Sequence, residues 1–263
     1  MRFVLVHGAN HGAWCWDLFI PEVEKLGHEA IAVDLPGHGA RHAEYSTLDG
    51  YRQAVVEALQ PGDVLVGHSM GAAVATTAAD AFPEIGHIIY LTGPLPVEGK
   101  CLSWELGGHS AGDDVSITSK GHPVASAVRF SEDSQYMDLG TLENATAALY
   151  HDCAPDVAAW AYQKLTPQNV DVIMGQPISV PTFWEADLPR SYIRCTDDRG
   201  NPIEYATRWA QRLGVEPLTI ATSHSPFLSR PAELAQLLLR AIETVPVGRL
   251  QPHSPGPIAL NQT

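Results

Sequence analysis

Positive charge is scarce in this sequence. It contains 16 Lys and Arg residues against 30 Asp and Glu residues, which gives a formal net charge of −14 at pH 7. Nucleic acids and anionic membrane surfaces are bound by clustered Lys and Arg, so this balance argues against both as partners. An acidic composition of this kind most simply keeps a chain soluble.

Long apolar runs and patterned cysteines are also lacking. The apolar run at residues 3–6 is too short for a signal-peptide core or a membrane span, so it predicts a buried strand instead. Cys15, Cys101, Cys153 and Cys195 have neither CxxC nor metal-ligand spacing. We therefore expect free thiols, a cytoplasmic location and no bound metal.

Strand and helix signals alternate over the first part of the chain. Short apolar runs at residues 3–6, 30–33, 64–66 and 88–91 are separated by helical patterns near 16–26, 48–59 and 70–82. This alternation predicts a parallel sheet with helices on both faces. At 263 residues with 45% hydrophobic content, the chain can bury one large core.

The alternation stops after residue 95 and resumes after residue 187. The interval 96–187 holds Gly-rich turns and a helical stretch near 142–164, which is typical of a cap or lid. Strand signals at 191–195 and 217–221 and helical patterns at 203–213 and 232–244 follow it. We expect an α/β core at 1–95 and 188–245, a cap at 96–187, and a Pro-rich, loosely ordered tail at 246–263.

The segment Gly67-His68-Ser69-Met70-Gly71 lies between the third predicted strand and the next helix. A G-x-S-x-G motif at such a turn places the serine in a strained conformation with its hydroxyl exposed above the sheet. The alternative is a Gly/Ser turn without chemistry, which the strand-to-helix context disfavours. Ser69 is therefore the candidate nucleophile, and the Met70 N–H is a candidate donor to a developing oxyanion.

A base and an acid are expected after the last two predicted strands, because the chain order in such sites is Ser, then Asp or Glu, then His. His224 follows the final strand signal and is the predicted base. Asp197 and Asp198 both follow the preceding strand, and the residues alone do not choose between them. The acid would accept the Nδ1 hydrogen of the histidine and fix its tautomer.

A second oxyanion donor is expected after the first strand, where His7-Gly8-Ala9 forms an HG-type turn. We assign this donor to the backbone N–H of Ala9. His7 could be mistaken for a catalytic base, but packing and hydrogen bonding beneath the turn is the better interpretation.

With these elements in this order, the chain resembles the α/β-hydrolase superfamily over essentially its whole length. Residues 3–16, 34–39, 192–202 and 224–231 are similar to the branch that holds plant methylesterases, the salicylate-binding esterase and the hydroxynitrile lyases. The resemblance implies an α/β-hydrolase fold: a mostly parallel six-stranded sheet, flanked by helices, with a small helical cap insertion. In that branch the acid lies four residues before a proline, which selects Asp198, four residues before Pro202.

Two positions depart from the lyases of that branch. The hydroxynitrile lyases carry a threonine after the first histidine and a lysine after the catalytic histidine, whereas this chain has Gly8 and Ser225 there. Without the lysine no cation would stabilise a leaving cyanide, so hydrolysis is favoured over lyase chemistry.

The sequence therefore predicts a serine carboxylic-ester hydrolase that forms an acyl-enzyme on a small to medium apolar ester, without a cofactor. Aromatic residues in and near the cap suggest an apolar acyl or alcohol group, although most buried aromatics are simply core. These aromatics are Trp104, Phe130, Tyr150, Trp160, Phe183 and Trp184. The candidate substrate contacts are Gly8, His11, Trp104, Phe130, Ser225 and Phe227.

Two other functions stay open at this point. A non-hydrolytic lyase or natural-product tailoring cyclase could use the same triad and would release neither acid nor alcohol. A ligand receptor built on a hydrolase fold would bind tightly with slow or absent turnover, since a fold alone does not fix function. A homodimer also stays open.

Overall fold

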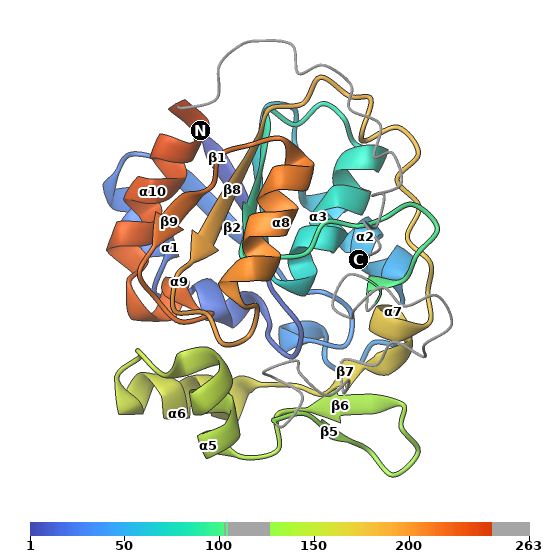
Figure 1. Ribbon diagram of the computed structural model, residues 1–263, viewed down its shortest axis with the longest axis vertical. Coiled ribbons are helices and arrows are strands. Elements are labelled where there is room, and N and C mark those ends of the chain that lie inside the picture. The colour runs from blue at the N-terminus through green and yellow to red at the C-terminus, as the bar shows by residue number, and fades with distance from the viewer. Residues whose placement is uncertain (103, 105–126, 244–263) are drawn as a thin grey trace, which may run out of the picture.

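The computed structural model describes residues 1–102, 104 and 127–243. Its main sheet has six strands in the spatial order β2-β1-β3-β4-β8-β9, and every pairing in it is parallel (Figure 1). The predicted parallel sheet is thus confirmed. The strands span Arg2–Val6 (β1), Glu29–Val33 (β2), Val64–His68 (β3), His87–Leu91 (β4), Arg190–Cys195 (β8) and Leu218–Ile220 (β9).

Helices cover both faces of this sheet. Successive strand residues point to opposite faces, and both faces are apolar here, so each face needs a covering layer. Val4 and Val6 belong to one buried cluster, and Phe3 and Leu5 belong to the other. The first cluster includes residues of α2 (Leu48–Ala58), α3 (Met70–Ala81) and α8 (Ile203–Leu213), and the second includes residues of α1 (Ile20–Lys25) and α10 (Pro231–Glu243). Full burial of one such apolar side chain contributes about 1.5–3 kcal/mol.

The first predicted helix differs from the structure. Residues 16–26 do not form one helix; a 3₁₀ turn, η1 (Ala13–Trp16), precedes α1. Pro21 lies at the start of α1, where its missing N–H removes no helical hydrogen bond. The helix therefore begins later than the hydrophobic pattern indicates.

Residues 127–169 of the interval 96–187 lie over one end of the main sheet (Figure 1). This region contains helices, as expected, and also a second, antiparallel sheet that the sequence analysis did not predict. The strands of this sheet are β5 (Arg129–Phe130), β6 (Tyr136–Asp138) and β7 (Gln168–Asn169). With only two or three residues each, they leave no alternating pattern in the sequence.

The cap helices are also shorter than expected. The stretch 142–164 divides into α5 (Leu142–Ala145), a π-helical segment η4 (Thr146–Tyr150) and α6 (Pro155–Lys164), and α7 (Val170–Met174) follows. Pro155 starts α6 because proline cannot continue a helix from the preceding turn. The boundaries 96–187 stay a prediction, and the predicted tail 246–263 lies outside the described residues.

Polar contacts hold the cap to the loop that follows β1. Asn10 Nδ2 donates to the carbonyl oxygens of Met137 (2.9 Å) and Thr166 (3.0 Å), and the Thr166 N–H donates back to Asn10 O (2.9 Å). The buried ring of His38 lies beside them, with Nδ1 2.7 Å from Thr166 Oγ1 and Nε2 2.9 Å from the Tyr51 hydroxyl.

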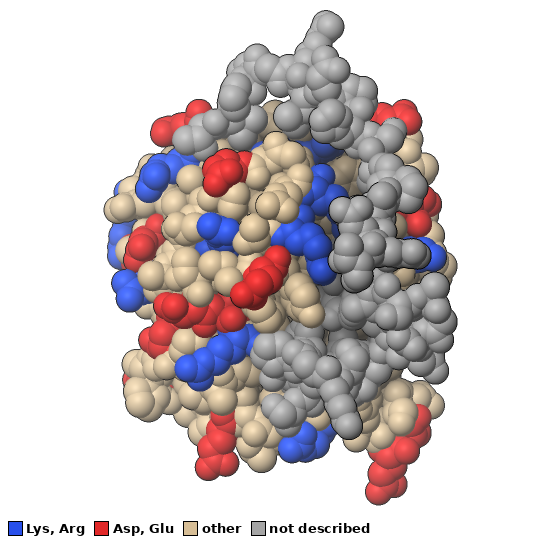
Figure 2. All heavy atoms as spheres, in the orientation of Figure 1, with Lys and Arg blue, Asp and Glu red and all other residues tan. Residues whose placement is uncertain are grey.

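The face of the molecule seen in Figure 2 is mixed in charge. On the face shown in Figure 2, Lys and Arg side chains are interspersed with Asp and Glu side chains. Within the described ranges, none of the helices combines the length and apolar character needed to cross a membrane.

The burial of His38 predicts a pH-dependent stability. Burial lowers the pKa of this imidazole from 6.5 to about 4. Between these values the unfolded chain binds a proton that the folded chain does not, so the stabilisation is present above pH 6.5 and is lost as the pH falls toward 4. From pH 7 to pH 5 this one group should lower the free energy of unfolding by about 2 kcal/mol.

Urea unfolding at both pH values measures this difference. Between pH 7 and pH 5, the free energy of unfolding of His38→Gln should fall by about 2 kcal/mol less than that of the wild type. The control His42→Gln, at an exposed position, should keep the wild-type difference. An unchanged pH difference in His38→Gln would contradict the assignment.

Candidate active site

Ser69 occupies the sharp turn between β3 and α3. Its backbone has φ 50° and ψ −126°, a conformation that costs a non-glycine residue about 1–3 kcal/mol. The flanking glycines allow the close approach: a Cβ on Gly67 would lie 2.6 Å from Ala72 Cα, and a Cβ on Gly71 would lie 2.4 Å from His7 O. The turn therefore has the geometry expected of a nucleophile elbow.

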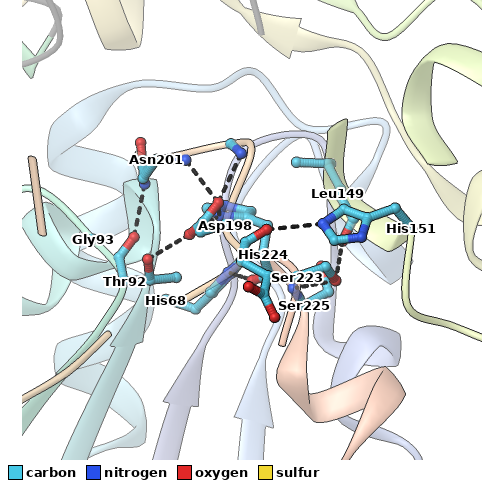
Figure 3. Close-up of polar contacts among 12 residues, drawn as sticks. His68, Thr92, Gly93, Leu149, His151, Asp198, Asn201, Ser223, His224 and Ser225 are labelled. Atoms are coloured by element: carbon cyan, nitrogen blue, oxygen red, sulfur yellow. Dashed lines mark hydrogen bonds and ion pairs between the residues drawn. The ribbon is translucent and has the colours of Figure 1, made fainter. Parts of the chain in front are cut away.

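Asp198 lies on the loop that follows β8, and His224 lies on the loop that follows β9. The two side chains contact each other (Figure 3). Both carboxylate oxygens of Asp198 lie 2.9 Å from His224 Nδ1, and both residues are buried. The carboxylate accepts the Nδ1 hydrogen and leaves Nε2 as the proton acceptor. Asp197, the alternative acid, is exposed.

The buried carboxylate of Asp198 is held by groups that the sequence analysis missed. Its Oδ1 accepts the backbone N–H groups of Gly200 (2.7 Å) and Asn201 (2.8 Å), and its Oδ2 accepts the Thr92 hydroxyl (2.5 Å). Asn201 Nδ2 in turn donates to Thr92 O at 2.7 Å (Figure 3). Thr92 follows β4, the neighbour of β8, at φ 40°. A signal was available, since a polar residue directly after a strand adjacent to the acid-bearing strand lies at the same sheet edge.

The cap contacts the acid and base loops through three residues of one short segment, 149–152. Leu149 O accepts the Ser223 hydroxyl (2.9 Å), and His151 Nε2 lies 2.9 Å from Asp197 O (Figure 3). Asp152 Oδ2 accepts the Ser223 N–H (3.0 Å). The loop that carries His224 is thus fixed from the cap side as well as by Asp198.

A pocket lies at Ser69 and His224, between the core and the cap. Among the described residues its lining includes no Lys, Arg, Asp or Glu side chain. Its apolar wall is formed by Met70, Pro94, Leu102, Val128, Met137, Leu139, Leu149 and Ile173. In the described part of the chain no hydrogen bond joins Ser69 to the His224 ring, a contact that in such sites commonly tightens only with substrate.

The two predicted oxyanion donors, Ala9 and Met70, line this pocket together with Gly8. Neither the Ala9 N–H nor the Met70 N–H has an acceptor among the described residues. A Cβ on Gly8 would lie 2.9 Å from Ser69 Cβ, so only glycine fits between the oxyanion loop and the nucleophile.

Two further histidines line the pocket and stay neutral. His11 Nδ1 donates to Ala9 O (2.8 Å) and its Nε2 accepts the Tyr150 hydroxyl (2.7 Å), while burial lowers its pKa to about 4. His68 Nε2 donates to His224 O (2.9 Å), and burial together with the nearby His224 lowers the pKa of His68 well below 6.5. Of these three rings only His224 has a carboxylate partner, so it is the ring suited to take up a proton.

The structure does not bring every predicted substrate contact to the pocket. Gly8 and His11 line it, whereas Trp104, Phe130, Ser225 and Phe227 are not among its described lining residues. Phe130 lies on β5 with 37% of its surface exposed, and Ser225 is fully buried. The ring of Phe227 packs against the rings of Trp16 and His68, with centroid separations of 4.6 Å and 4.8 Å. Phe227 therefore supports His68, which lines the pocket.

The remaining aromatics are packing residues too. Tyr150 is buried against His11, and Trp160 packs edge-on to Trp14 at 5.4 Å. Phe183 and Trp184 lie against the guanidinium of Arg190. The apolar wall therefore comes from aliphatic side chains and methionines instead. Within residues 1–102, 104 and 127–243, no cluster of three His, Cys, Asp or Glu side chains could hold a metal ion.

Residues 3–237 match the family model of the alpha/beta hydrolase family, and the chain belongs to this family. Methylesterase 9 of Arabidopsis thaliana is 27% identical over 93% of this chain and 99% of its own. Norfluorocurarine synthase 1 of a Strychnos species is 27% identical over 93% of this chain and 96% of its own. The relatives named as esterases are consistent with an esterase enzyme, as the resemblance implied.

Solved structures show the same fold. A pyrethroid hydrolase from Sphingobium faniae JZ-2 superimposes with a TM-score of 0.77 at 24% identity, covering 93% of this chain and 98% of its own.

The Thr92 contact predicts a loss of activity on removal of one hydroxyl. Thr92→Val keeps the shape but removes the hydroxyl donor to Asp198 Oδ2, which then keeps only the His224 Nδ1 contact. A hydrogen bond to a charged group contributes about 1.5–3 kcal/mol, so kcat/KM for an ester substrate should fall roughly 10- to 100-fold. Thr92→Ser should restore most of it. The control Thr77→Val removes a buried hydroxyl that donates to Val74 O, away from the acid, and should leave kcat/KM unchanged. Full activity in Thr92→Val would refute the role.

Proposed function

We propose that this protein is a serine carboxylic-ester hydrolase with Ser69 as nucleophile, His224 as base and Asp198 as the residue that orients the base. The observation that carries the proposal is the buried Asp198–His224 pair at the pocket that also contains the strained turn of Ser69. A carboxylate that fixes the base and a serine on such a turn are the parts that acyl transfer requires.

The reaction proceeds in two halves. His224 Nε2 takes the Ser69 hydroxyl proton as Oγ attacks the ester carbonyl, and the N–H groups of Ala9 and Met70 hold the oxyanion. The C–O bond to the alcohol then breaks, and the alcohol leaves with the proton from His224. A water molecule next gives a proton to His224 and attacks the acyl carbonyl; the C–O bond to Ser69 breaks, the acid is released, and His224 returns the proton to Ser69 Oγ.

The lining supports a small to medium apolar ester as substrate. Its aliphatic wall offers no charged partner among the described residues, so a neutral acyl group is favoured over one that carries a carboxylate or an ammonium group. The esterase names of several relatives support the same reaction class.

A non-hydrolytic reaction on the same triad is the second candidate, because one relative is named norfluorocurarine synthase. Product analysis separates the two: hydrolysis releases one acid and one alcohol for each substrate consumed, and a tailoring reaction does not.

Removal of the nucleophile tests the proposal. Ser69→Ala should lower turnover of p-nitrophenyl acetate and butyrate on the order of 10⁶-fold, because the acyl-enzyme can no longer form. The control Ser225→Ala, at a fully buried serine that is not a described lining residue, should keep its activity. Ester turnover in Ser69→Ala near the wild-type rate would sink the proposal.

A further inference from the structure

His7, at the end of β1, is fully buried and makes two hydrogen bonds with backbone groups. Its Nδ1 lies 2.8 Å from Gly8 O, and its Nε2 receives the Leu35 N–H at 3.2 Å. The triad does not use this ring.

These two partners permit a single form of the ring. The Leu35 N–H can only donate, so Nε2 must present a lone pair. Gly8 O can only accept, so Nδ1 must carry the hydrogen. Burial lowers the pKa of His7 well below 6.5, which keeps the ring neutral and this tautomer in place.

The bond to Gly8 O fixes the direction of another group. In a trans peptide the C=O of one residue and the N–H of the next point in opposite directions across one plane. The Gly8 carbonyl is held by His7 Nδ1 and, at 3.4 Å, by the His11 N–H. The Ala9 N–H on the same plane therefore points away from the His7 ring.

The direction of the Ala9 N–H needs a restraint because the residue before it, Gly8, has a flexible backbone. A Cβ there would lie 2.9 Å from Ser69 Cβ and 3.0 Å from His68 Nδ1, so the site demands glycine. Glycine leaves its backbone dihedrals free to vary. A preorganised donor, which oxyanion stabilisation needs, then requires hydrogen bonds that restrain the peptide, and the shorter of the two at Gly8 O comes from His7.

We propose that His7 is the positioning residue of the oxyanion hole: it holds the Gly8–Ala9 peptide plane so that the Ala9 N–H faces the oxyanion on the substrate. This rests on the proposed function, in which Ala9 supplies one donor. His7 is not among the described lining residues of the pocket, so it would act through the Gly8–Ala9 peptide.

Two substitutions separate the two hydrogen bonds of the ring. In His7→Asn, the amide nitrogen replaces Nδ1 and keeps the donor to Gly8 O. In His7→Gln, the amide oxygen replaces Nε2 and keeps the acceptor for the Leu35 N–H, while the donor to Gly8 O is lost. Each variant loses one buried bond, so a purely structural role would affect both alike.

We expect His7→Gln to lower kcat for p-nitrophenyl butyrate about 10²- to 10³-fold with KM nearly unchanged, as for loss of one oxyanion donor. Inhibition by an arylboronic acid, which forms a tetrahedral adduct on serine, should weaken by a similar factor. His7→Asn should stay within about tenfold of the wild type in both measurements. Equal losses in the two variants, or no loss in His7→Gln, would overturn the proposal.

The amide resonance of Ala9 in a ¹⁵N-labelled sample tests the restraint without any catalysis. It should broaden or shift in His7→Gln and stay close to the wild-type position in His7→Asn. An unaltered resonance in His7→Gln would overturn the positioning role. A wild-type protein that turns over no ester, with the Ala9 resonance behaving as expected, would instead refute the proposed function and leave the restraint established.

Discussion

The close approach of α3 to the sheet is the constraint on which the site depends. Gly67 and Gly71 have no side chains, so the first turn of the helix lies directly against the backbone of β1 and β3. Ser69 is forced into its strained conformation at that point, with φ 50°. The cost of about 1–3 kcal/mol is sustained because the buried sheet over-determines the turn. Gly8 lies close to Ser69 at this point, and both line the pocket together with Met70.

Beside this turn, the buried carboxylate of the acid is fully hydrogen-bonded. Asp198 accepts hydrogen bonds from two backbone N–H groups, the Thr92 hydroxyl and His224. A half-satisfied buried carboxylate would be costly, whereas a fully bonded one fixes a single arrangement. The neutral histidines at positions 7, 11 and 68 each hold a backbone carbonyl in place. In the proposed reaction, charge develops on His224 and the substrate, while the surrounding imidazoles only orient backbone groups.

The sequence alone predicted the core and the main candidates because their signals are local. The strand and helix periods, the G-x-S-x-G turn and the His-Gly turn each lie within a few residues. Asp198 needed the family pattern, since Asp197 beside it has the same chemistry. Thr92 meets Asp198 across 106 positions, and Tyr150 meets His11 across 139, so only the packed fold reveals them. The cap was the hardest part, because its strands are too short to carry a period and its aromatics pack rather than line the pocket.

The most direct test of the central claim is to react the wild-type protein with a fluorophosphonate probe and locate the adduct by peptide mass spectrometry. The account predicts one adduct, on Ser69, and no adduct in His224→Ala, where the serine has no base. A folded wild-type protein that stays unlabelled, or one labelled at another serine, would contradict the claim that Ser69 is an activated nucleophile.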